Sequence, residues 1–117
     1  MAKRFSLLLG VILLAVGLVG SFTGGHAHNF VIFGINFAHN VVHILSGILA
    51  LLAAQAGERY AKLYCLAFGI VYGLVAIGGF LNVAALVELL NLNAADNLLH
   101  LVIAAACLWV GTQAKAA

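Results

Sequence analysis

The sequence predicts an all-α fold, namely a bundle of four transmembrane helices built from two parallel, pseudo-repeated helical hairpins. The chain of 117 residues is 66% hydrophobic and 7% charged and has no proline, and its mean hydropathy is +1.21. A soluble domain carries about 25% charged residues. The apolar runs are continuous, which favours helices, because a membrane barrel needs alternating apolar and polar residues. A polar motif that occurs twice in the chain predicts that the two hairpins are pseudo-repeats.

Four apolar segments approach the roughly 20 residues that the hydrocarbon core of a bilayer requires. They run from about 5 to 22, 39 to 56, 61 to 81 and 98 to 113. We therefore expect one membrane domain over residues 1–117, with pseudo-repeats 1–57 and 58–117. The first segment also resembles a signal peptide, but its apolar run is long and its removal would destroy the repeat. We expect it to be retained.

The basic residues predict the orientation of the bundle. All five fall at the end that carries the termini: Lys3, Arg4, Arg59, Lys62 and Lys115. The two opposite connections, 23–38 and 82–96, contain no lysine or arginine. Because cytoplasmic loops carry the excess of basic residues, we expect a multi-pass inner-membrane protein with both termini in the cytoplasm. The lipid bilayer is its expected partner, and nothing points to nucleic acid.

The two outer connections are expected to differ. In the first, a pair of glycines at 24 and 25 ends the helix, and Asn29 is predicted to cap a short helical turn. In the second, residues 82–90 are predicted to be helical, and they either continue the third helix with a bend or lie flat at the membrane interface. Small residues predict close packing between helices, within the chain, in a homo-oligomer or in a membrane complex. They are Gly10, Gly17, Ser21, Gly69 and Gly73.

The repeated motif is Asn-x-x-His/Asp-Asn-x-x-His, with its two copies 57 residues apart. Each copy places four polar residues on one helical face. They are Asn36, His39, Asn40 and His43, and Asn93, Asp96, Asn97 and His100. A polar stripe within lipid must face the bundle interior. We therefore expect His43 and His100 to meet near a pseudo-two-fold axis, and Asn36 and Asn93 to cap their helices.

One hypothesis for this stripe is a metal site near the extracytoplasmic face. His39, His43, Asp96 and His100 would supply three imidazoles and one carboxylate, a set that suits zinc or another divalent transition ion. The asparagines of the motif would orient these ligands from behind: Asn36, Asn40, Asn93 and Asn97. His26 and His28, on the outer connection, would form an entry or accessory site.

Two other hypotheses stay open. The stripe could be a purely structural network that fixes helix register in a membrane scaffold or assembly subunit, since Asn and His bond across helices. Alternatively, His43 and His100 could ligate one haem iron axially. Nothing in the sequence assigns a catalytic residue, and we expect no enzyme activity. Cys65 and Cys107 are not spaced as a redox or metal motif, and we expect reduced, buried thiols.

The sequence from Asn36 to Gly47, with its echo from Asn93 to Ala104, resembles a family of small bacterial four-helix membrane proteins catalogued only as a domain of unknown function. The resemblance covers nearly the whole chain. It implies the four-helix fold and a membrane location, and it implies no activity or cofactor.

Overall fold

The structure is a computed structural model and describes residues 1–115. Its elements, in chain order, are α1 (Ala2–Phe22), β1 (His28–Phe30), β2 (Phe33–Ile35), α2 (Phe37–Ala56), α3 (Glu58–Phe80), α4 (Ala84–Leu90) and α5 (Ala94–Gln113). The helices α1, α2, α3 and α5 are each long and apolar enough to cross a membrane. The all-α class is therefore confirmed, with one short β-hairpin as an addition to it.

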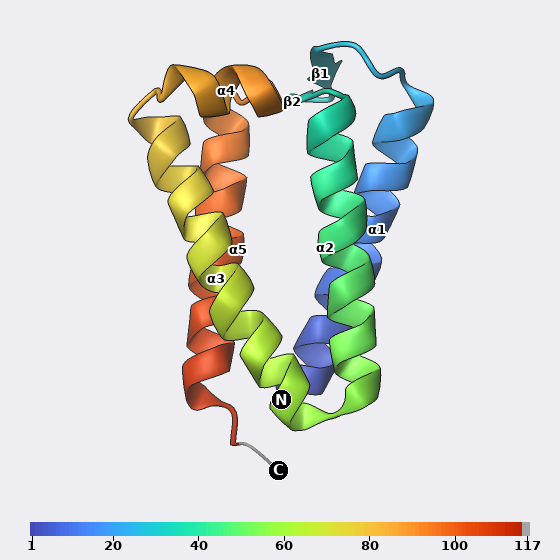
Figure 1. Cartoon of the computed structure of the whole chain (residues 1–117), viewed down its shortest axis with the longest axis vertical. Coiled ribbons are helices and arrows are strands. Elements are labelled where there is room, and N and C mark those ends of the chain that lie inside the picture. The colour runs from blue at the N-terminus through green and yellow to red at the C-terminus, as the bar shows by residue number, and fades with distance from the viewer. Residues whose placement is uncertain (116–117) are drawn as a thin grey trace.

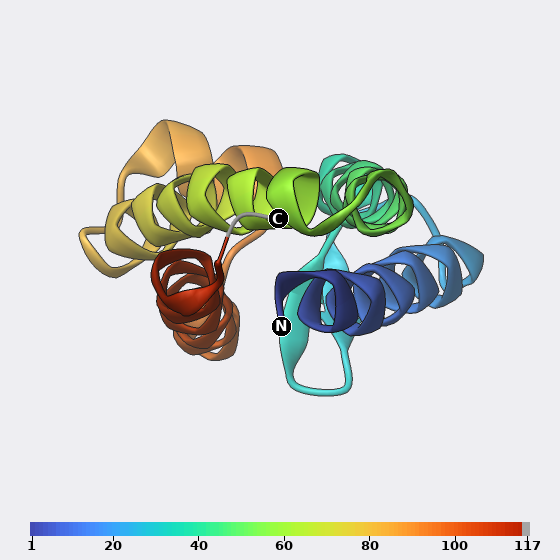
Figure 2. The ribbon, with the colours of Figure 1, turned by 90° about the horizontal axis from the view of Figure 1, so that it is seen from below.

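The long helices form two pairs, α1 with α2 and α3 with α5 (Figure 1). The strands and α4 lie at one end of the bundle, and the N-terminus and the end of α5 lie at the other (Figure 1). Seen from that second end, α2 and α3 form one row, and α1 and α5 lie on the same side of it (Figure 2). The turn between α2 and α3 is the single residue Gly57, which has a φ of +130° that favours glycine.

Both predicted asparagine caps are confirmed. Asn36 precedes α2 in an extended conformation, and its side chain accepts a hydrogen bond from the backbone N–H of His39. Asn93 does the same for α5 through the backbone N–H of Asp96, and the Asp96 carboxylate accepts the N–H of Asn93 in return. This reciprocal capping box satisfies two backbone donors that a helix start leaves open. The caps fix where each polar stripe begins.

The first outer connection differs from its predicted structure, whereas the second contains a helix as predicted. Asn29 does not cap a helical turn; it pairs with Gly34 in the antiparallel hairpin of β1 and β2. β-Branched and aromatic residues fill this hairpin, and they favour extended backbone. In the second connection, α3 continues straight through its two glycines to Phe80, and a turn with Asn82 at φ +56° separates it from α4. α4 is thus a separate short helix that crosses the end of the bundle (Figure 1).

Close helix contacts hold each pair together. A Cβ on Gly10 of α1 would lie 2.9 Å from the carbonyl oxygen of Gly47 in α2, and a Cβ on Gly69 of α3 would lie 2.7 Å from the Leu108 side chain in α5. These approaches agree with the expected use of small residues in helix packing. The Ser6 hydroxyl donates to the Ala50 carbonyl at 2.7 Å, which joins α1 to α2 again.

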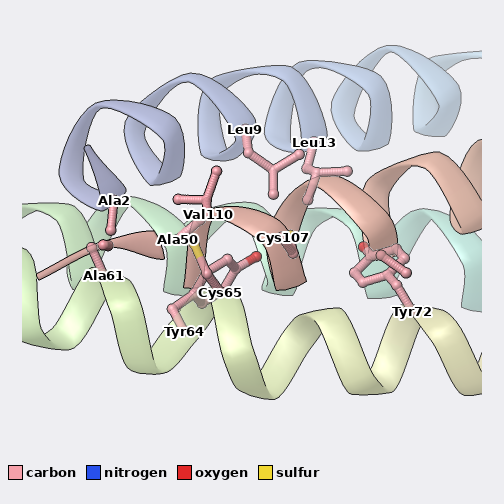
Figure 3. Close-up of a cluster of buried hydrophobic side chains, with 12 residues drawn as sticks. Ala2, Leu9, Leu13, Ala50, Ala61, Tyr64, Cys65, Tyr72, Cys107 and Val110 are labelled. Atoms are coloured by element: carbon pink, nitrogen blue, oxygen red, sulfur yellow. The ribbon is translucent and has the colours of Figure 1, made fainter. Parts of the chain in front are cut away.

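The apolar core occupies the half of the bundle nearer the termini. It contains Leu9 and Leu13 of α1, Tyr64 of α3 and the free, buried thiols of Cys65 and Cys107 (Figure 3). The other half is different, because its interior is filled by the polar residues of the repeated motif.

Candidate metal centre

Three histidines meet inside the outer half of the bundle. His39 and His43 lie one turn apart on α2, and His100 reaches them from α5. The ring centroids are 4.5 Å apart for His39 and His43, 5.4 Å for His39 and His100, and 6.0 Å for His43 and His100. Each side chain is 3% exposed or less. The predicted meeting of His43 and His100 is thus observed, with His39 as a third member.

The three imidazoles are arranged so that one ligand atom of each lies within 4.8 Å of the other two. Four of their ring nitrogens are buried and have no hydrogen-bond partner within residues 1–115. They are His39 Nε2, His43 Nδ1, His43 Nε2 and His100 Nδ1. Buried polar atoms are normally paired, because an unpaired one costs about 1–3 kcal/mol. This cluster therefore has nitrogen lone pairs available for an additional group.

His39 is held by α4, the short helix that crosses the outer end of the bundle. Its Nδ1 lies 3.0 Å from the carbonyl oxygen of Leu90, the last residue of α4. A carbonyl oxygen only accepts, so we assign the proton to Nδ1 and the lone pair to Nε2. Metal-binding histidines commonly donate their second ring N–H to a carbonyl in this way, which fixes the tautomer and the ring orientation.

Two asparagines of the motif lie beside the histidines on the same helices. Asn40 is buried with both its Oδ1 and its Nδ2 unpartnered within residues 1–115, and the Oδ1 of Asn97 is unpartnered as well. Each packs against a glycine of the neighbouring helix: a Cβ on Gly20 would clash with Asn40, and a Cβ on Gly79 would clash with Asn97. Both side chains thus lie against a glycine of the neighbouring helix, and these polar atoms have no partner among the described residues.

Asp96 has a different position from the one its place in the motif predicts. It is not among the residues whose ligand atoms come within 4.8 Å of one another. Its Oδ2 accepts two backbone N–H groups, from Asn93 and from Gly34 of β2, each at 3.0 Å. The carboxylate therefore caps α5 and anchors the hairpin to it, and the structure does not bring it into the histidine cluster.

The remaining predicted residues also lie outside the cluster. The side-chain N–H groups of Asn36 and Asn93 donate to the carbonyls of Leu89 and Ile32 respectively, each at 2.9 Å, so both amides tie the helix starts to the outer connections. The rings of His26 and His28 lie 4.5 Å apart, tilted relative to one another, on the connection after α1. His28 bonds to Thr23 and to the carbonyl of His26, each at 2.7 Å, and neither ring joins the buried site.

Two cavities flank the histidines. One of about 150 Å³ lies under the hairpin and is lined by Val16, Phe30, Val31, Phe33, Ile35, His43, Asp96 and Leu99. The other, of about 30 Å³, lies under α4 and is lined by His39, Val42, Ser46, Val71, Tyr72, Val75, Leu90 and His100. Both are mostly apolar, which keeps the histidine nitrogens in a medium of low dielectric constant.

Several site residues could not be identified from the motif. The Tyr72 ring lies 5.5 Å from the His100 ring, and its buried hydroxyl has no partner within the described chain. Asn91, at φ +52°, ends α4 and donates to the carbonyls of His28 and Ile35 at 3.2 and 3.0 Å. Asparagine tolerates this left-handed conformation and often ends helices, and this preference is the sequence signal that could have identified Asn91.

The fold and this site define a small membrane domain of four apolar helices with a buried histidine cluster. The chain belongs to the family described as "Domain of unknown function (DUF4383)", which it matches over residues 3–113. This confirms the family resemblance and adds no activity to it. No curated protein and no solved structure matches the chain.

Proposed function

We propose that this protein binds a divalent transition metal within the membrane, with zinc favoured, through His39, His43 and His100. The observation that supports this best is the group of three buried imidazoles with converging, unpartnered nitrogens. Three histidines leave one coordination position of a tetrahedral zinc open, as in catalytic and transfer sites. We propose no reaction at that position.

The ligand geometry needs a small contraction to bind zinc. Zinc–nitrogen bonds of about 2.0–2.1 Å place tetrahedral ligands about 3.3 Å apart, compared with a present limit of 4.8 Å. The His43 ring is free to rotate, since neither of its nitrogens is bonded to the described chain. Its rotation would bring one of those nitrogens closer to the ligand nitrogens of His39 and His100. His39 would stay in place because Leu90 holds it. Asn40 and Asn97 would then bond to the ligands or to a metal-bound water.

The structural network is the second candidate. It is supported by the asparagine caps and by the bonds that join α5 and α4 to the hairpin. A closed network, however, would satisfy its own buried groups, and the centre of this one leaves His43 and Asn40 entirely unpartnered within residues 1–115. The haem hypothesis has less support, because the His39 ring contacts both other rings and the adjoining cavities are far smaller than a porphyrin.

We also propose that residues 1–57 and 58–117 are pseudo-repeats. Buried positions of α1 recur in α3 59 residues later: Ala2, Ser6, Gly10, Leu13, Gly17 and Gly20 correspond to Ala61, Cys65, Gly69, Tyr72, Ala76 and Gly79. Those of α2 recur in α5 57 residues later: His39, Asn40, His43, Gly47, Ala50 and Ala54 correspond to Asp96, Asn97, His100, Ala104, Cys107 and Gly111. Under these offsets the two cavities also correspond to one another, which supports a parallel duplication.

The proposed setting is the bacterial inner membrane, with both termini in the cytoplasm. The basic residues near the termini support this orientation. The metal would then lie near the extracytoplasmic face, beneath the hairpin and α4. Glycine-rich helix faces remain available for a homo-oligomer or for a larger membrane complex.

Metal analysis of the purified protein tests the proposal. We expect about one zinc per chain in the wild type, and loss of that zinc in His43→Ala and in His100→Ala. Ser46→Ala is the matched control, since it changes a buried polar residue of α2 one turn from His43 and should leave the zinc content unchanged. Circular dichroism would establish that the variants stay folded. Wild-type protein that takes up no stoichiometric zinc or other divalent ion would refute the metal site, and a Soret band would favour haem.

A further inference from the structure

A third cavity, of a different kind, lies at the end of the bundle that carries the termini. It has a volume of about 300 Å³ and is lined by Lys3, Arg4, Leu7, Ala54 and Gln55. These residues come from the start of α1 and the end of α2. The surface that lines this cavity is almost entirely apolar, so it is formed by the apolar parts of Lys3, Arg4 and Gln55 together with Leu7 and Ala54. The basic groups of Lys3 and Arg4 therefore lie next to an apolar surface, at the end of the bundle where the helices would leave the bilayer.

The two basic side chains have no acidic partner in the described part of the chain. The ion pair found there joins Glu58 to the N-terminal ammonium group at 3.0 Å. The same carboxylate also accepts the backbone N–H groups of Ala2 and Lys3, at 2.6 and 3.0 Å. The other two acidic residues, Glu88 and Asp96, lie at the opposite end of the bundle. Lys3 and Arg4 are both exposed, and neither is paired with a carboxylate of the described residues, so both can bind an external anion.

We propose that an anionic phospholipid binds here, with part of an acyl chain against the apolar cavity and its headgroup at Lys3 and Arg4. Lys3 and Arg4 would contact the phosphate, for which the planar guanidinium offers paired donors. Gln55 would bond to the polar part of the headgroup. Leu7, which is 51% exposed, would lie along the first methylene groups of an acyl chain. Basic pockets between helices at the membrane surface recognise anionic lipids by this combination of charge and apolar contact.

The second helix pair supplies an internal comparison. Under the offsets that relate the two pairs, Lys3 corresponds to Lys62, but Arg4 corresponds to Leu63. Leu7 corresponds to Leu66, whose side chain would lie 2.8 Å from a Cβ on Gly111, the counterpart of Ala54. That position therefore has one basic residue and a leucine packed tightly against the neighbouring helix. The combination of two basic residues is specific to the first pair, so we expect one high-affinity lipid per chain.

Native mass spectrometry of the purified full-length protein tests this inference, with phosphatidylglycerol and phosphatidylcholine added separately. We expect one retained phosphatidylglycerol on the wild type and no retained phosphatidylcholine. The double variant Lys3→Gln/Arg4→Gln should bind phosphatidylglycerol about 25-fold more weakly, because each basic residue that contacts the anionic headgroup directly contributes about fivefold. The matched control is Arg59→Gln/Lys62→Gln, which removes two cations from the same end of the bundle but outside this cavity, and it should bind as the wild type does.

A third variant, Leu7→Trp, fills the cavity without changing its charge and should also weaken binding. Equal weakening in the control and in the Lys3/Arg4 variant would overturn the inference, since it would mean general attraction by net charge. Retention of binding in Leu7→Trp would overturn it too, and so would competition by millimolar inorganic phosphate, which would indicate a site for the free anion. Zinc content should not change in any of these variants, so this test is independent of the metal proposal.

Discussion

The Nδ1 atom of His39 lies 3.0 Å from the carbonyl oxygen of Leu90, and this one contact joins the histidine cluster to the helix that covers it. The next residue, Asn91, bonds in turn to both strands of the hairpin. The position of one site imidazole therefore depends on α4 and on the hairpin, two segments that contribute no histidine to the cluster.

The first prediction concerns Asn91. Asn91→Ala removes two partly buried hydrogen bonds and releases the end of α4, so we expect a loss of about 1–3 kcal/mol in the free energy of unfolding. Zinc affinity should fall about tenfold, as is common when the group that orients a ligand is disturbed. Asn91→Asp should lower both the stability and the zinc affinity further, because it would point a carboxylate at two carbonyl oxygens. Thermal unfolding and competitive zinc titration measure the two effects, and a stable Asn91→Asp variant with full affinity would contradict this account.

A second prediction compares two glycines of α3. A Cβ on Gly79 would clash with the Asn97 side chain, whereas a Cβ on Gly73 would meet the Cβ of Ala104 at an ordinary 3.7 Å. Gly79→Ala should therefore lower the free energy of unfolding by about 1–3 kcal/mol, the usual cost of overpacking. Gly73→Ala should be neutral or stabilising by up to about 1 kcal/mol, since alanine favours the helix. Unfolding of both variants in the same detergent is the measurement, and equal effects would rule out the proposed contact.

The third prediction separates the structural role of Asp96 from a role as ligand. Asp96→Ala removes the acceptor for the N–H groups of Gly34 and Asn93, which should cost about 1–3 kcal/mol of unfolding free energy. Zinc stoichiometry, measured below the unfolding temperature, should remain that of the wild type. If the folded variant loses its zinc without losing stability, Asp96 is the fourth ligand that the repeated motif predicted.

A fourth prediction addresses the opposite end of the bundle. Glu58 of α3 accepts backbone N–H groups from the first turn of α1, so Glu58→Ala should lower the melting temperature. Glu88→Ala is the control, because Glu88 is an exposed carboxylate on α4 and should have little effect on melting. Differential scanning fluorimetry of the two variants gives the comparison. A larger loss in the Glu88 variant would show that the cap is not the source of the stability.

The long helices could be predicted because apolar segment length alone determines a membrane span. The meeting of His43 and His100 could also be predicted, because polar side chains in lipid must turn inward. The hairpin could not be predicted, and the sequence left open whether the helical residues 82–90 continue α3 or form a separate helix, since short connections depend on contacts with distant residues such as Asn91 and Asn93. Asp96 shows the limit of reading a motif by symmetry. It occupies the position of His39, but one turn from a helix start a carboxylate can accept backbone N–H groups, and a protonated imidazole nitrogen cannot.

The bonds from Glu58 to α1 also bear on the order in which the protein assembles. Glu58 follows α2 in the chain, so α1 and α2 can pair before the residue that completes the start of α1 has been synthesised. Until α3 joins them, the N–H groups of Ala2 and Lys3 can bond only to interfacial water. The start of the first helix pair is therefore completed by a residue of the second, so full capping of α1 depends on the start of α3.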